Sequence, residues 1–217
     1  MTANDESRRL AETFASKLAL ASGATANAGT VTVGEHSLSL RPEVEQVASA
    51  PDGHVFAGVK VSCKIDGEPV DALTAGSVGI DWSRDAALVT AAEDWAMQYG
   101  KPIVDALSAK APALHSGGYK VYAGPVGIRG SKPEGLDDVN ASFFRAVEPA
   151  LALLVTAKTG LHSITIMAVR ENDGSVDGEF RVDGQVSEGL KQRALQMRWP
   201  PSNATYMLKQ YYVLRGD

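Results

Sequence analysis

Apolar side chains recur every three or four residues near the start of the chain. Leu10, Phe14 and Leu18 have the i, i+4, i+8 spacing that places side chains on one face of an α-helix. Gly23 stands where the pattern stops, and residues 22–30 are only small or polar. We therefore expect an amphipathic helix over residues 5–21, followed by a flexible connection.

A strictly alternating pattern follows between two Asp-Gly dipeptides, which are strong turn signals. Every second residue from Val55 to Ile65 is apolar or small, and the intervening positions include Lys60, Ser62 and Lys64. This alternation predicts a strand over His54–Ile65 with one buried face. Shorter strand candidates precede it at Thr30–Val33, Ser37–Leu40 and Val44–Val47.

The middle of the chain returns to helical spacing. We expect a helix capped by Asp85 that runs to about Gln98 and is broken by Gly100, then a short helix from Pro102 to about Ala109. After these the pattern predicts an interrupted strand over Gly118–Ile128 and a mostly buried helix over Asn140–Ala157.

The C-terminal quarter carries the clearest pattern. Ser163–Val169 and Gly178–Val186 flank an Asn-Asp-Gly turn and predict a hairpin. Ser187 can cap a helix that ends near Met197. The final strand, Thr205–Leu214, has apolar residues on both faces, which is typical of a strand that is covered on both sides.

Helices and strands come partly in blocks, and no repeat recurs at a fixed period. This order favours an α+β fold with a mixed, mainly antiparallel sheet flanked by helices and a C-terminal hairpin-helix-strand unit. We expect one globular domain over residues 1–217, with a division into a β-rich lobe, 1–72, and an α+β lobe, 73–217, as the alternative.

Composition and charge narrow the classes of function. The net charge is −5 and the sequence has no basic stripe, which argues against binding to nucleic acid. If the protein has a protein partner, the acidic charge favours a basic one. The sequence contains no run of 18 apolar residues, the length that a membrane-spanning helix needs. Its polar first residues lack the pattern of a signal peptide, so we expect a cytoplasmic protein. Cys63 stands alone, which excludes an internal disulfide and suggests a small core residue.

Motifs for metals and cofactors are not met. The four histidines are not spaced as metal ligands, and no CxxC pair occurs. The glycines at 124, 127 and 130 match neither a phosphate loop nor a dinucleotide turn. We therefore expect no metal and no cofactor.

One short sequence resembles a hydrolase nucleophile turn. His115-Ser116-Gly117-Gly118 has the serine and the following glycine, but Leu114 replaces the first glycine of GxSxG. A small hydrolase-like enzyme with a site assembled from scattered residues is therefore an alternative. Its candidate catalytic residues are His115, Ser116, Asp81 and Arg129.

Aromatic residues gather in the final segment. Trp199, Tyr206, Tyr211 and Tyr212 have two interpretations: core packing, or a protein-binding face, since Tyr and Trp are enriched at binding hot spots. These four are our candidate binding residues.

Residues 78–214 resemble an uncharacterised bacterial family of unknown function. The resemblance lies in Trp199-Pro200 and in Met207-Leu-Lys-Gln-Tyr-Tyr-Val-Leu214. Small acidic α+β proteins of this kind are also similar to toxin-immunity proteins, which implies a protein partner. Our leading hypothesis is a non-enzymatic protein that binds another protein, as an immunity protein or adaptor does. The alternatives are the hydrolase and a structural homo-oligomer subunit.

Overall fold

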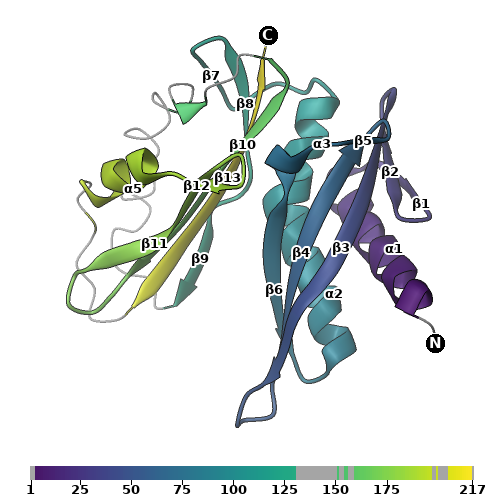
Figure 1. The fold of residues 1–217 in the computed structure, drawn as a ribbon, viewed down its shortest axis with the longest axis horizontal. Coiled ribbons are helices and arrows are strands. Elements are labelled where there is room, and N and C mark those ends of the chain that lie inside the picture. Colours follow the sequence, from purple (N-terminus) through teal and green to yellow (C-terminus); the bar gives the residue numbers. More distant parts are fainter. Residues whose placement is uncertain are drawn as a thin grey trace. The chain divides into compact units, whose positions relative to one another are not determined.

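The chain divides between Ala111 and Pro112 into two units, each with its own antiparallel sheet. The computed structural model describes residues 3–130, 151, 154–155, 159–196, 199 and 205–216. The division lies well after residue 72, where we placed the alternative boundary. That residues 1–217 form one domain stays a prediction. The α+β class and the antiparallel pairing are confirmed, with two sheets instead of one (Figure 1).

Helix α1, Ala3–Ser22, opens the first unit and confirms the helix expected over residues 5–21. Phe14 and Leu18 are fully buried on its apolar face. Gly23 ends the helix with a φ of 75°, and its backbone N–H donates to the carbonyl of Ala19. The sequence pattern and the end of the helix agree because glycine adopts this left-handed backbone without strain.

The first sheet has the strand order β1-β2-β3-β4-β5, and β6 pairs with β4 beside β5. A register shift between Val44 and Gln46 lies inside β3. The two strands expected at 37–40 and 44–47 are therefore one strand, because the irregularity changes the alternation without ending the pairing. The strands are β1 Thr25–Asn27, β2 Thr30–Val33, β3 His36–Ser49, β4 Val55–Ile65, β5 Glu68–Pro69 and β6 Ala75–Asp81.

Strand β6 is the longest strand that lies outside the predicted ones, and the short strand β1 lies in the connection that we expected to be flexible. The inward positions of β6 hold only small residues, because helix α2, Arg84–Trp95, packs directly on this strand. A Cβ at Gly79 would lie 1.8 Å from the carbonyl oxygen of Ala87. The Ser77 hydroxyl donates to the Ala91 carbonyl at 2.9 Å. The larger residues of β6 therefore face away from the helices, which reverses the usual pattern.

The helical segment that follows is continuous where we expected a break. Ser83, not Asp85, caps α2, since its hydroxyl accepts from the Ala86 N–H. The chain then continues through the π-helical turn η2, Ala96–Gly100, into α3, Lys101–Leu107. Gly100 does not end the helix. It lets Leu18 and Trp95 approach closely, since a Cβ there would lie 2.7 Å and 2.8 Å from their side chains.

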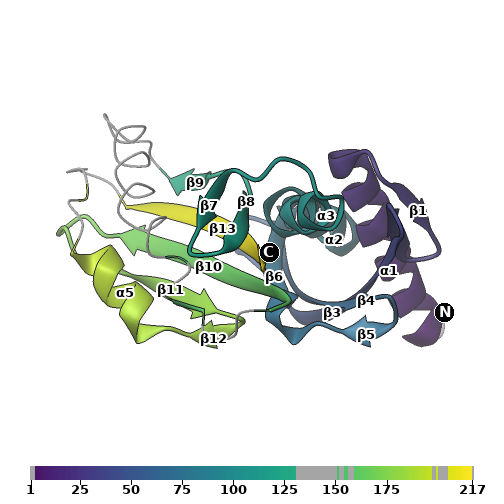
Figure 2. The same cartoon turned by 90° about the horizontal axis from the view of Figure 1, so that it is seen from above.

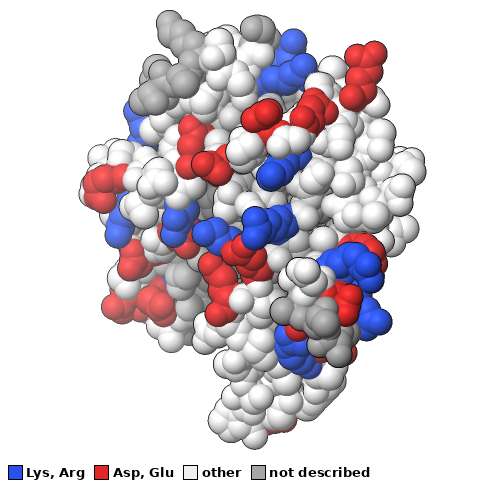
Figure 3. Space-filling model, turned by 45° about the vertical axis from the view of Figure 1, so that its right-hand side comes forward, with Lys and Arg blue, Asp and Glu red and all other residues white. Residues whose placement is uncertain are grey.

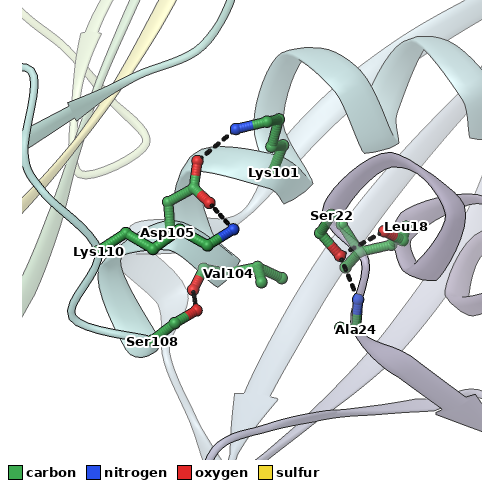
Figure 4. Close-up of polar contacts among 8 residues, drawn as sticks. All are labelled: Leu18, Ser22, Ala24, Lys101, Val104, Asp105, Ser108 and Lys110. Carbon is green, nitrogen blue, oxygen red and sulfur yellow. Dashed lines mark hydrogen bonds and ion pairs between the residues drawn. The ribbon is translucent and has the colours of Figure 1, made fainter.

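An ion-pair network closes the end of α3. Asp105 accepts from the ammonium groups of Lys101 at 2.5 Å and Lys110 at 2.8 Å (Figure 4). Ser108 also hydrogen-bonds the Val104 carbonyl in the same turn. The backbone of this turn is satisfied separately, since the Ser108 N–H donates to the Val104 carbonyl and the Lys110 N–H donates to the Asp105 carbonyl.

The second sheet has the order β12-β11-β10-β13-β8-β7, and β9 also pairs with β13. β13 thus lies between β10 on one side and β8 and β9 on the other, which confirms the predicted central position. The strands are β7 Leu114–Ser116, β8 Tyr119–Ala123, β9 Gly127–Gly130, β10 Leu161–Arg170, β11 Val176–Val182, β12 Gln185–Val186 and β13 Tyr206–Gly216.

The interruption expected within 118–128 lies between β8 and β9. There the Gly124 carbonyl accepts from the buried amide of Gln210 at 2.8 Å. The predicted hairpin is β10–β11, and helix α5, Glu188–Leu195, follows it with Ser187 as the confirmed cap. Helix α5 lies beside β11 (Figure 2). The core of this unit includes Ile164, Phe180 and Leu190. Most of the helix expected over 140–157 falls outside the described residues.

Candidate functional site

The candidate catalytic residues come from both units. Asp81 ends β6 in the first unit, where its carboxylate accepts from the Trp82 N–H at 2.7 Å. His115, Ser116 and Arg129 belong to β7 and β9 of the second unit. The side chain of Arg129 lies outside what the structure describes. Each unit is described by itself, so a site that combines Asp81 with the other three stays a prediction.

His115 and Ser116 are neighbours in one strand. Successive side chains of a strand point to opposite faces, and here His115 is exposed whereas Ser116 is buried. A serine nucleophile needs its base within hydrogen-bond reach. Their strand geometry therefore does not bring these two residues together as a nucleophile and its base.

The candidate binding tyrosines lie in the interior. Tyr206, Tyr211 and Tyr212 are no more than 1% exposed. Trp199 is partly buried, donates its indole N–H to the Ala194 carbonyl at 3.0 Å and packs near Tyr206. The core-packing interpretation therefore replaces the binding face for the three tyrosines. Burial also raises the pKa of the Tyr206 hydroxyl.

Metal and thiol chemistry have little support among the described residues. No group of three or more His, Cys, Asp or Glu side chains there is placed to hold a metal ion. Cys63 lies on the inner face of β4, and burial raises the pKa of its thiol to about 12. A nucleophilic cysteine requires the opposite shift.

The most unusual surface of the described chain is the outer face of the first sheet, opposite the helices. Large apolar residues are exposed there: Phe56 at 37%, Val78 at 42% and Ile80 at 40%. Phe56 is the cross-strand partner of Ile80, and Gly58 is the partner of Val78. Trp82 follows β6 and is 68% exposed. We call Phe56, Val78, Ile80, Trp82 and His54 the apolar ladder.

His54 and Trp82 continue the cross-strand pairing beyond the strand ends. Their ring centroids are 3.9 Å apart and their planes are 28° from parallel. The Asp52 carboxylate contacts His54 Nδ1 at 2.9 Å and accepts from the His54 N–H at 3.1 Å. These hydrogen bonds lower the pKa of the Asp52 carboxyl. The turn thus fixes the imidazole, and the imidazole supports one side of the exposed indole.

Charged residues occupy the same face farther along β3 and β4. Arg41, Glu43, Lys60 and Lys64 alternate with the buried residues of these strands. Glu43 is the cross-strand partner of Lys60 and pairs with Arg41 at 3.5 Å. Three of these four are cations, whereas Glu45 at the register shift of β3 and Asp52 in the turn beside His54 add two exposed anions.

Charged side chains of both signs are mixed over much of the surface. Lys, Arg, Asp and Glu side chains are interspersed over the face drawn in Figure 3. The tip of the β3–β4 hairpin, which points down in Figure 1, shows few of them. The apolar ladder begins at this end of the sheet, at His54 and Trp82.

A sequence signal exists for the β6 side of the ladder, although none of the predicted strands covers it. Residues 75–82 read Ala-Gly-Ser-Val-Gly-Ile-Asp-Trp, with a large apolar residue at every second position from Val78 to Trp82. The alternating positions are small or acidic. Such a pattern predicts a strand, but it assigns the large residues to the core, whereas here the small ones are buried.

None of the described helices combines the length and hydropathy that a membrane span requires.

Comparison with known proteins identifies one family. No curated protein and no solved structure matches the sequence. A family of unknown function, DUF6348, matches residues 45–216, a range that includes the apolar ladder and the whole second sheet. This match confirms the resemblance to a family of unknown function that we noted for residues 78–214. The chain therefore belongs to the family of unknown function DUF6348.

Proposed function

We propose that the protein acts by binding another protein through the outer face of its first sheet. The observation that carries this proposal is the apolar ladder, in which Val78, Ile80 and Trp82 lie beside Phe56 and His54 and are at least 40% exposed. Contiguous exposed apolar residues are typical of interaction sites, and aromatic residues dominate binding hot spots.

Packing alone does not account for the ladder. The close approach of α2 requires small residues on the inner face of β6, such as Gly79. It places no demand on the outer face, where Thr, which has high strand propensity, or Lys, which is common on edge strands, would stay hydrated. Large apolar residues at these positions therefore serve something other than the fold of the first unit.

The charges beside the ladder favour a partner of particular chemistry. Arg41, Lys60 and Lys64 occupy outward strand positions next to the ladder, with Glu43 as the anion among them. The partner that complements it presents apolar side chains flanked by carboxylates. The net charge of −5 led us to expect a basic partner, which stays a prediction, whereas our proposal of an acidic partner rests on the outward strand residues Arg41, Lys60 and Lys64. An inhibitory or adaptor role, as the resemblance to immunity proteins implies, uses this kind of contact.

Site-specific photo-crosslinking tests the proposal. A benzophenone amino acid at position 78 of the full chain is irradiated in extract of the source organism, and captured proteins are identified by mass spectrometry. The matched control carries the probe at Leu20, a single apolar residue that is 80% exposed on α1. We expect a protein captured at position 78 but not at position 20.

Binding of the captured protein should depend on the apolar ladder and on the lysines next to it. In purified form its affinity should fall at least tenfold with Ile80→Glu and with Lys60→Glu/Lys64→Glu, and it should weaken with added salt. Equal capture at both positions would overturn the proposal. Capture of a second copy of this chain at position 78 would overturn it in favour of self-association. Affinity that is indifferent to the charge reversals would refute the acidic partner.

A further inference from the structure

The corner between β4 and β5 is closed by a hydrogen-bonded clip. Asp66 has a φ of 53°, a conformation that is rare for residues other than glycine. Its carboxylate accepts from the Ser37 N–H at 2.8 Å and contacts His36 Nδ1 at 2.8 Å. The Asp66 N–H donates in turn to the Ser37 carbonyl at 2.9 Å. The side chain and backbone of Asp66 thus hold the start of β3.

The same clip closes the corner between β11 and β12 in the second unit. Asp183 has a φ of 50°, and its carboxylate accepts from the Ser163 N–H at 2.9 Å. His162 Nδ1 contacts the same carboxylate at 2.8 Å, and the Asp183 N–H donates to the Ser163 carbonyl at 2.9 Å. Each contact of the first clip has a counterpart here, in a different sheet.

The surrounding strands are also equivalent. Leu38 pairs with Ile65 in the first unit, and Ile164 pairs with Val182 in the second, directly beside the clips. The orders β1-β2-β3-β4-β5 and β8-β13-β10-β11-β12 correspond strand by strand, and every pairing is antiparallel. The connections differ, because β13 comes last in the chain whereas β2 precedes β3.

The two corners share a sequence pattern. Residues 65–73 read Ile-Asp-Gly-Glu-Pro-Val-Asp-Ala-Leu, and residues 182–190 read Val-Asp-Gly-Gln-Val-Ser-Glu-Gly-Leu. The last residues, Leu73 and Leu190, are both fully buried and both lie in the helical turn after the corner. The pattern is present at these two places and does not recur at a fixed spacing along the sequence.

We propose that the chain contains one conformational device twice: a His-Ser/Asp-Gly clip that locks a hairpin corner and directs the following leucine into the core of its unit. Local chemistry explains its parts. Glycine after the aspartate, Gly67 or Gly184, accepts a positive φ without strain. The aspartate tolerates this conformation because its short side chain hydrogen-bonds locally. The device does not depend on the proposed binding function, and it makes the two corners interchangeable.

Exchange of the corners in the full chain tests the device. One variant carries residues 182–186 at positions 65–69 and residues 65–69 at positions 182–186, so that Ser187, the cap of α5, stays in place. We expect its Tm to stay within about 3 °C of the parent, a shift that corresponds to a minor change in stability for a chain of this size. We also expect the Ser37 and Ser163 amide protons to remain protected from hydrogen exchange, as monitored by NMR.

A matched variant keeps the composition but removes the clip. Asp66→Glu/Glu68→Asp preserves net charge, yet the longer side chain cannot place its carboxylate on the Ser37 N–H. It should lose the protection at Ser37, keep that at Ser163 and lower the Tm. Asp183→Glu should do the reverse. Loss of both protected amides in the exchanged chain would overturn the proposal, as would full protection at Ser37 in Asp66→Glu/Glu68→Asp.

Discussion

The imidazole of His54 lies against the indole of Trp82, with 3.9 Å between the ring centroids. Neither residue belongs to a strand, yet together they add a third cross-strand contact after Gly58–Val78 and Phe56–Ile80. The turn residue Gly53 lies next to the same indole, since a Cβ there would be 3.6 Å from it. The exposed end of the ladder is therefore held in place by the turn before β4.

Replacement of Trp82 separates this surface from the core. Trp82→Ala should change the free energy of unfolding by no more than about 0.5 kcal/mol, because the side chain is mostly exposed. Trp95→Ala should lower it by about 3–5 kcal/mol, since Trp95 is fully buried and packs near Phe14. Urea unfolding followed by far-UV circular dichroism measures both. A large loss for Trp82→Ala would mean that the ladder is structural.

Two glycines of β6 give a matched pair for the packing of α2. Gly79→Ala should destabilise the protein by about 3 kcal/mol, because its methyl group would overlap the backbone of α2 at Ala87. Gly76→Ala should be close to neutral, since the nearest atom is 3.7 Å away, at the Val59 carbonyl. Thermal unfolding of the two variants under one condition tests the difference. Similar melting temperatures would contradict the close approach of the helix.

Sequence patterns predict the parts of this fold in which side-chain size and burial agree. In α1 the buried residues are the large ones, as in Phe14 and Leu18, so helical spacing is enough. The same holds for β4 apart from the exposed Phe56, and for β13, whose two apolar faces indicate a central strand. Ser187 acts as a cap because its hydroxyl bonds the backbone locally, without help from the rest of the fold.

The predictions from sequence fail where close packing buries small residues and leaves large apolar residues exposed. Gly79 and Ser77 are buried in β6 because the α2 backbone is so near, which leaves Val78 and Ile80 outside. Gly100 is tolerated in a helix because α1 leaves no room for a Cβ. A single sequence does not reveal these distances. The tyrosines of β13 were candidates for a binding face for a related reason, since composition alone does not distinguish a buried aromatic residue from an exposed one.

Cys63 should be unreactive while the protein is folded. Burial raises the pKa of its thiol to about 12, so the reactive thiolate is nearly absent at neutral pH. With a disulfide reagent such as DTNB at pH 8, we expect modification to be at least 100-fold slower in buffer than in 6 M guanidinium chloride. The denatured chain is the control for the reagent. Rapid modification of the native protein would show that the first sheet opens at β4.

Asp105 should link stability to pH. Burial raises the pKa of its carboxyl, but the hydrogen bonds from Lys101 and Lys110 outweigh burial and leave that pKa lowered. A carboxyl with a lower pKa in the folded state stabilises the protein above its unfolded pKa, about 3.9, and this contribution is lost as the pH falls through the folded pKa. The effect is therefore present at pH 7 and absent in strong acid.

Asp105→Asn tests this linkage. At pH 7 it should lower the free energy of unfolding by roughly 1 kcal/mol, a value reduced for the partly exposed lysines, and the difference from the parent should disappear near pH 2. Glu12→Gln is the matched control, because Glu12 meets Arg8 only at 3.9 Å on an exposed face of α1. Urea unfolding of the three proteins at both pH values measures the effect. A deficit in Asp105→Asn that persists at pH 2 would show that the network stabilises α3 through side-chain shape and not through charge.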